Sequence, residues 1–322
     1  MKTLTVLLLA ALLATNVVAQ PQGLTKSGKK AIVDSIAKNL ERRYVFFDTA
    51  KRMGKYIQQQ LRKGVYDTIV APSVFADRLT ADILSVYHDG HLSISYDPSF
   101  SPGSDVEDTA ARRTRHRLER HVNFGFDKLE MLRGGIFYIK IGGFFPPDDE
   151  AKETVRAVFR LAVNGKALVI DLRMNGGGDP GMVSYMCGFL FADKTHLNDL
   201  YTRSSNTLQQ FWTQPNNELP ALHSIPVYVL TSKNTFSAGE EFTYDLQAQK
   251  RATVIGETTG GGAHPVWPLA VGNGFVANIP FARAINPVTK TNWEAIGVKP
   301  DVPVLADDAL TVAVKMISDA KK

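Results

Sequence analysis

Ser237 is placed where a serine could act as a nucleophile. It lies between an apolar run at 227–230, which predicts a buried strand, and a polar–apolar pattern at 238–251, which predicts a helix. Such a corner puts the hydroxyl beside free backbone amides that can receive an oxyanion. Ser237 and Glu240 also fit a capping box, with serine as the N-cap. Taken alone, the segment favours the cap, because S-x-x-E is a common pattern.

A glycine-rich loop offers a second set of backbone amides. Gly176, Gly177 and Gly178 follow a predicted strand at 167–172 and precede a predicted helix at 181–191. Adjacent glycines leave the backbone unshielded, so the loop could bind an anion or line an oxyanion hole. It matches neither the dinucleotide-binding pattern nor the P-loop. A plain tight turn is the default interpretation.

Two further features supply an imidazole and a carboxylate. His91, in Asp-Gly-His, lies before a predicted strand at 91–96, and Glu294 follows Trp293 just before a turn. Alone, Glu294 is typical of a surface acid, and a lone histidine is more often structural. Nothing in the sequence distinguishes the other histidines, which are His88, His116, His121, His196, His223 and His264.

The elements that must position these residues form two groups. Residues 27–42, 49–63 and 72–87 have apolar side chains at helical spacing and predict a small helical unit. From residue 122 onward, predicted strands and helices alternate, which indicates a βα-layered core with parallel strands. Two apolar runs at 266–279, joined at Gly272-Asn273-Gly274, predict a hairpin within this core.

Chain-wide features limit the possible functions. Residues 1–19 have a basic start, an apolar stretch and a small-residue cleavage site, which predict a secretory signal peptide and export to a periplasm or the exterior. Cys187 is the one cysteine, so neither an internal disulfide nor a cysteine metal site is possible. The net charge of +5 and the basic run at 112–120 leave an anion site open, but a solvated face is favoured and nucleic-acid binding is not expected.

Four motifs, at 171–178, 231–240, 256–261 and 297–301, occur in the order found in a known family. Together they resemble the C-terminal-processing (tail-specific) serine peptidases, especially the branch with tricorn core protease and the interphotoreceptor retinoid-binding protein modules. The resemblance implies an α/β, crotonase/ClpP-like core at 122–310, after a helical domain at 20–96 and a connector at 97–121. A tail helix at 311–322 completes this division. The connector is too short for a PDZ module, since domains hold at least ~50 residues.

The resemblance also assigns roles. Ser237 falls at the nucleophile, His91 at the histidine of the tricorn-like pattern and Glu294 at its carboxylate. Ala238 with Gly177 or Gly178 would form the oxyanion hole. The lysine of the tail-specific dyad is absent from the loop at 260–262, and Gly90 stands where tricorn has a serine that links histidine and glutamate, so Glu294 would have to contact the imidazole directly or through water.

The sequence therefore predicts an exported serine peptidase acting on extended or unfolded peptides, without metal or organic cofactor and without a membrane span. A histidine takes the proton of the serine, and a carboxylate orients the histidine. Two alternatives remain open. One is a non-catalytic module of the same fold that binds apolar ligands or peptides, and the other is an esterase. The sequence does not determine the oligomeric state.

Overall fold

The structure is a computed structural model that describes residues 24–101, 109–214 and 216–320. The predicted signal peptide at 1–19 lies outside these residues. Among the described helices, none is long and apolar enough to cross a membrane.

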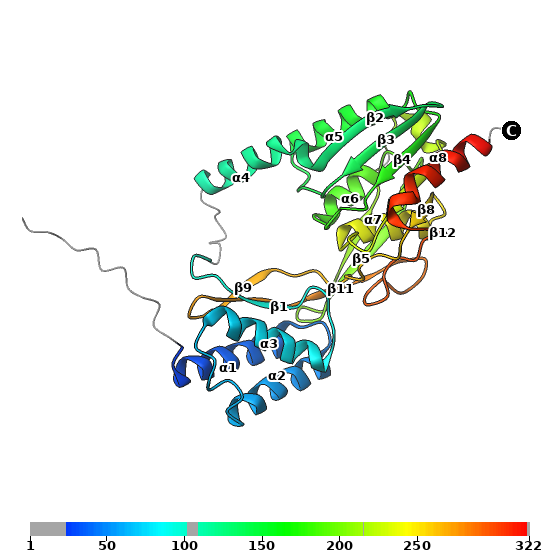
Figure 1. The fold of residues 1–322 in the computed structure, drawn as a ribbon. Coiled ribbons are helices and arrows are strands. Elements are labelled where there is room, and N and C mark those ends of the chain that lie inside the picture. Colours follow the sequence, from blue (N-terminus) through cyan, green and yellow to red (C-terminus); the bar gives the residue numbers. More distant parts are fainter. Residues whose placement is uncertain (1–23, 102–108, 215, 321–322) are drawn as a thin grey trace, which may run out of the picture.

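A six-stranded sheet forms the centre of the larger unit (Figure 1). Its strand order is β12-β8-β7-β4-β3-β2, and all neighbouring strands from β3 to β12 are parallel, as predicted, whereas β2 is antiparallel to β3. Strands β4 and β7 are apolar and almost wholly buried, because helices cover both faces of the sheet. The strands are β2 (Phe126–Leu132), β3 (Ile136–Ile141), β4 (Ala167–Asp171), β7 (Val227–Thr231), β8 (Ala252–Gly256) and β12 (Val302–Pro303).

Helices lie on both sides of this sheet. On one face, α5 (Asp149–Ala162), α6 (Pro180–Cys187) and α7 (Ala238–Ala248) bury their apolar sides against β3 and β4. On the other face, α8 (Ala309–Asp319) packs against β3, β4, β7 and β8. The segment expected to be a tail helix thus belongs to the layered core. The parallel strands and these helices make the α/β architecture that the sequence predicts.

The helical unit is built from two parts of the sequence that lie far apart. Helices α1 (Lys26–Arg43), α2 (Phe47–Arg62) and α3 (Pro72–Val86) pack on a small antiparallel sheet. Its strand order is β1-β10-β9, with β1 (Ser93–Tyr96), β10 (Phe275–Asn278) and β9 (Pro268–Gly272). The hairpin predicted around Gly272-Asn273-Gly274 is therefore present. It packs with the helices, although the sequence division placed it in the 122–310 core.

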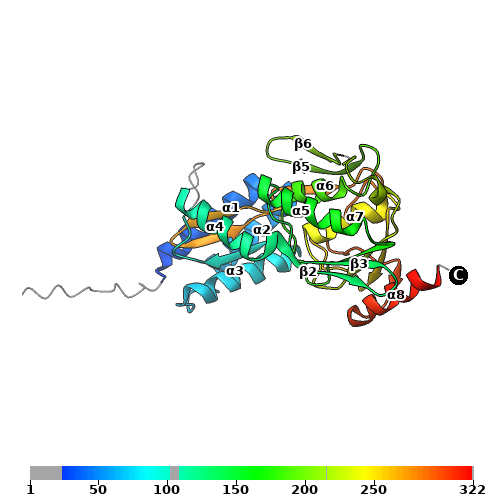
Figure 2. The same cartoon turned by 90° about the horizontal axis from the view of Figure 1, so that it is seen from above.

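A third sheet, which the sequence analysis missed, lies beside α6 and α7. It has the order β11-β5-β6, with β11 (Ala282–Ile285), β5 (His196–Thr202) and β6 (Thr207–Trp212). Figure 2 shows the β5–β6 hairpin and the strands β2 and β3 on opposite sides of α6 and α7. The basic run is helical, in α4 (Thr109–His121), and several of its cations pair with acids, such as Arg120 with Glu150 at 2.7 Å.

Candidate active site

Ser237 lies at the corner between β7 and α7. Its backbone angles, φ 53° and ψ −122°, lie outside the regions that non-glycine residues usually occupy. The capping box predicted from the sequence is present, and the Ser237 N–H donates to Glu240 Oε2 at 2.9 Å. A strained backbone of this kind persists where the surroundings hold it, which is common at active sites. Ser237 is therefore both the helix cap and a candidate nucleophile.

Glu240 holds this corner against a second loop. Its carboxylate accepts the N–H groups of Gly261 at 2.6 Å and Gly262 at 2.8 Å, in addition to that of Ser237. The Thr259 hydroxyl also donates to it. Burial raises the pKa of Glu240, although these hydrogen bonds oppose the shift. The carboxylate therefore fixes the position of the serine corner relative to the loop at 259–262.

The glycine loop packs directly against Ser237. A Cβ atom at Gly177 would lie 2.7 Å from Ser237 Cβ and 3.1 Å from the Ala238 nitrogen, so only glycine fits there. The Gly177 N–H already donates to Asn175 Oδ1 at 2.9 Å. Gly178, with Ser237 and Ala238, lines a small pocket. Of the two glycines predicted for the oxyanion hole, Gly178 is the one beside this pocket.

His91 lies next to the serine corner, where its ring packs on that of Phe236, the residue before Ser237. The ring centroids of His91 and Phe236 are 4.6 Å apart, and a Cβ at Gly262 would lie 2.7 Å from His91 Cε1. Burial lowers the pKa of His91 to about 4, although Asp89 raises it. In the described part of the chain, no hydrogen bond joins His91 to Ser237 or Glu294, and His91 Nδ1 has no partner.

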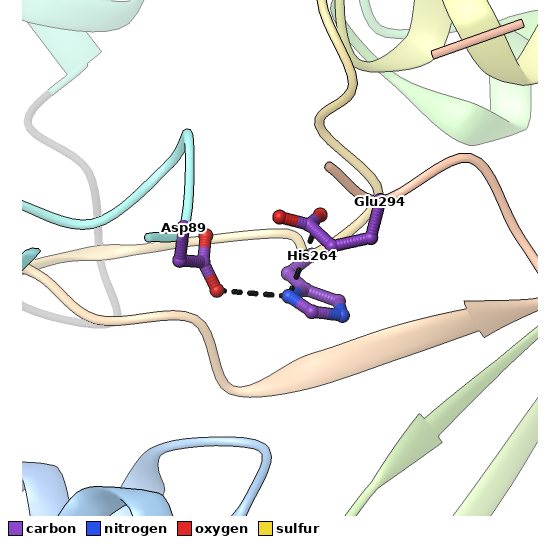
Figure 3. Close-up of side chains that lie close together, drawn as sticks. All are labelled: Asp89, His264 and Glu294. Carbon is purple, nitrogen blue, oxygen red and sulfur yellow. Dashed lines mark hydrogen bonds and ion pairs between the residues drawn. The ribbon is translucent and has the colours of Figure 1, made fainter. Parts of the chain in front are cut away.

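Glu294 lies beside a different histidine (Figure 3). His264 Nδ1 is 2.8 Å from Asp89 Oδ2 and 3.4 Å from Glu294 Oε2, and all three side chains are buried. The Ala263 N–H also donates to Glu294 Oε2, at 2.6 Å. Burial raises the pKa of Glu294 to about 7, and Asp89 adds to this, whereas His264 lowers it. Glu294 Oε1 is buried without a partner among the described residues.

The structure thus brings together Ser237, Ala238 and Gly178, with His91 nearby, and places Glu294 in a cluster with Asp89 and His264. Sequence reasoning did not single out His264. Its one local signal is its place after the glycines at 260–262. The contact that distinguishes it comes from Asp89, which is remote in the sequence.

The same residues form one of two groups whose spacing could suit a metal ion. Asp89, His264 and Glu294 offer ligand atoms that all lie within 4.8 Å of one another, and His116, Glu119 and Asp148 do the same at a more exposed place. Contacts of His264 with Asp89 and Glu294, and of His116 with Asp148, bring most of these side chains together without an ion. We therefore assign no metal to either set.

Fold and site together define a class of hydrolase, the serine-type peptidases of the C-terminal-processing kind. The pattern of peptidase family S41 matches residues 135–304, and that of the N-terminal domain of peptidase S41 in eukaryotic IRBP matches residues 23–121. The chain belongs to peptidase family S41. These matches confirm the family and the class of enzyme that the sequence motifs predicted.

Individual relatives agree with this assignment. The chain is 32% identical, over 187 residues, to carboxyl-terminal-processing peptidase 2, chloroplastic, of Arabidopsis thaliana; the match covers 52% of this chain and 32% of that protein. The chain therefore spans about a third of that relative's length.

Solved structures show the same fold. A protein from Parabacteroides merdae, described as a peptidase, has a TM-score of 0.62 at 16% identity, covering 89% of this chain and 96% of that one. The tricorn protease has a TM-score of 0.57 at 14% identity, covering 92% of this chain and 37% of that one.

Proposed function

We propose that this protein hydrolyses peptide bonds in extended or unfolded peptides, with Ser237 as the nucleophile. The observation that carries the proposal is the serine corner itself. Ser237 has a strained backbone, lies at the start of α7 and lines a pocket together with Ala238 and Gly178. The described residues form no hydrogen bond to the amides of Ala238 and Gly178, so both could donate to an oxyanion.

His91 is the residue that we assign as general base. A neutral imidazole can take the serine proton and return it to the leaving amine. The low pKa of about 4 keeps the His91 ring neutral over the physiological range. The absence of a side chain at Gly262 makes room for this ring, because a Cβ there would meet both His91 and Phe236. Catalytic hydrogen bonds that are long in a free enzyme often shorten once substrate is bound.

Glu294 would orient His91 and stabilise its protonated form. His91 Nδ1 and Glu294 Oε1 are both buried without a partner among the described residues. His91 Nδ1 can carry a proton, and Glu294 Oε1 can accept it. Buried polar atoms are rarely left unpaired. A hydrogen bond between these two atoms would complete the catalytic set. His264 and the Ala263 N–H then hold the other oxygen of Glu294 in place.

A fluorophosphonate probe tests the nucleophile directly. We expect a covalent adduct on Ser237, located by mass spectrometry, and loss of labelling in Ser237→Ala. Ser205→Ala, at an exposed serine, is the control and should label normally. Hydrolysis of casein-like peptides in preference to p-nitrophenyl esters would separate a peptidase from an esterase.

The opposite result has a clear meaning. A folded protein that is inert to the probe, and that binds apolar ligands or peptides without cleaving them, would be a non-catalytic module of this fold. The serine would then serve only as a helix cap, and Ser237→Ala would lower stability by about 0.5–2 kcal/mol.

We also propose export to a periplasm or the cell exterior. Support comes from the basic, apolar and small-residue order of residues 1–19. Mass spectrometry of the protein secreted from its source cells should find Gln20 as the first residue. Recovery of the unprocessed chain from the cell interior would contradict this proposal.

A further inference from the structure

The pocket beside Ser237 contains polar side chains that the proposed reaction does not use. It is lined by Ser237, Ala238 and Gly178, and also by Asn198 and Glu241. Both of these polar side chains are buried, Asn198 fully and Glu241 to 6% exposure. Asn198 comes from β5 and Glu241 from the first turn of α7, so rigid elements hold both.

The pocket is positioned to receive one particular part of a substrate. A carbonyl group attacked by Ser237 must place its oxygen against the amides of Ala238 and Gly178. The side chain of the same residue begins two bonds from that carbonyl carbon. Because the pocket shares Ser237, Ala238 and Gly178 with the reacting centre, this side chain is the one that enters it.

The size of the pocket limits this side chain to a few atoms. Its volume is about 50 Å³, whereas one buried water needs ~10–15 Å³ on the same scale. Buried Ala263, Ala284 and Trp293 form its walls. A long or branched side chain would have to displace well-packed groups, which is unfavourable.

One hydrogen-bond acceptor among the pocket residues lacks a donor. Asn198 Nδ2 donates to Glu241 Oε1 at 3.0 Å, which leaves Asn198 Oδ1 buried without a partner among the described residues. No Lys, Arg or His is among the described residues that line the pocket. An unpaired buried acceptor is unfavourable, so a ligand that brings a donor gains binding energy.

We infer that this pocket selects substrates with a small, unbranched, hydroxyl-bearing residue, serine, on the acyl side of the cleaved bond. The hydroxyl would donate to Asn198 Oδ1 or to the Glu241 carboxylate while the methylene group contacts the alanines. Burial raises the pKa of Glu241. A hydroxyl can both donate and accept, so it suits Glu241 in either protonation state. An ammonium group suits only the carboxylate and is carried on a longer chain.

This inference rests on the proposed peptidase function, and its test separates the two. Internally quenched peptides carry serine, α-aminobutyrate, alanine or lysine at one position, and product masses identify the cleaved bond. α-Aminobutyrate has the shape of serine without the hydroxyl. We expect kcat/KM to be at least about 10-fold higher for serine, since a hydrogen bond to a charged group contributes ~1.5–3 kcal/mol. A serine-to-aminobutyrate ratio below about twofold, or fastest cleavage at lysine, would overturn the inference.

Two variants complete the experiment. In Glu241→Gln the serine-to-aminobutyrate ratio should fall several-fold, whereas in Glu153→Gln, at an exposed acid of α5, it should match the wild type. Ser237→Ala allows the same peptides to be compared by calorimetric binding, without turnover and independently of whether Glu241→Gln folds. Tighter binding of the serine peptide there, with no cleavage by the wild type, would refute the peptidase and keep the pocket assignment. Equal binding of both peptides would refute the pocket assignment.

Discussion

His264 Nδ1 lies 2.8 Å from Asp89 Oδ2, although 175 residues separate them in the sequence. The Tyr44 hydroxyl donates to the same carboxylate at 2.9 Å. Asp89 is fully buried, and its other oxygen accepts the His91 N–H at 3.1 Å. One carboxylate thus connects the end of α1, the segment that carries His91 and the loop beside Glu294.

Replacement of this carboxylate should destabilise the fold. We expect Asp89→Asn to lower the free energy of unfolding by about 1.5–3 kcal/mol, the usual contribution of hydrogen bonds to a charged group. Chemical denaturation monitored by circular dichroism measures the change. Asp77→Asn, at an exposed position on α3, is the control and should leave the unfolding midpoint nearly unchanged. Equal midpoints for the two variants would contradict the role given to Asp89.

The pH dependence of kcat/KM should follow Glu294 rather than His91. The pKa of Glu294 is raised to about 7 by burial and by Asp89, and its carboxylate is the form that can stabilise a protonated His91. Below that pKa, kcat/KM should fall roughly tenfold per pH unit, since kcat/KM reports groups of the free enzyme. His91, with a pKa of about 4, is already neutral in this range.

The fall of kcat/KM at low pH is the acid limb of the pH profile. Two substitutions should shift this limb along the pH axis in opposite directions. Asp89 raises the pKa of Glu294 and His264 lowers it. Asp89→Asn should therefore shift the limb to lower pH and His264→Gln to higher pH, and Glu294→Gln should abolish it. A limb that stays near pH 7 in Glu294→Gln would show that another group controls the rate.

The close contact between Gly177 and Ser237 predicts a sharp difference between neighbouring glycines. Gly177→Ala would place a Cβ 2.7 Å from Ser237 Cβ, at a φ of 111° that disfavours alanine. We expect kcat/KM to fall by about 10²–10³, the loss typical of a damaged oxyanion hole. Gly176→Ala is the matched control, because a Cβ there meets nothing within 4 Å. Similar activity of both variants would argue against the assigned oxyanion hole.

Gly262 should tolerate no side chain for a related reason. A Cβ there would lie 2.3 Å from Phe236 Cζ and 2.7 Å from His91 Cε1. Gly262→Ala should therefore displace His91 and lower kcat, while fluorophosphonate labelling of Ser237 slows in parallel. Unchanged kcat would mean that the His91 ring can move without loss of function, which would weaken its assignment as the base.

The sequence predicted the elements with strong periodicity. The residues of α1 and the strands β4 and β7 were found because buried elements have continuous or regularly spaced apolar residues. Strand β6 was missed because five of its six residues are exposed, so it has no apolar alternation to detect. The pairing of β1 with β10 joins distant segments, and no local pattern encodes it.

The candidate site divides in the same way. Local motifs identified Ser237 and the glycine loop, because a strand–turn–helix corner is a local structure. The histidine that contacts Glu294, by contrast, is determined by the tertiary structure. Seven histidines were available, and burial beside Asp89, which no spacing reveals, determines that His264 is the one in contact.

Asp89 and His91 precede α4, whereas Ser237, His264 and Glu294 follow it. A fragment limited to the 135–304 region would consequently carry the nucleophile without the imidazole assigned to activate it. Under the roles proposed for His91 and Ser237, hydrolysis would therefore require both regions in one chain.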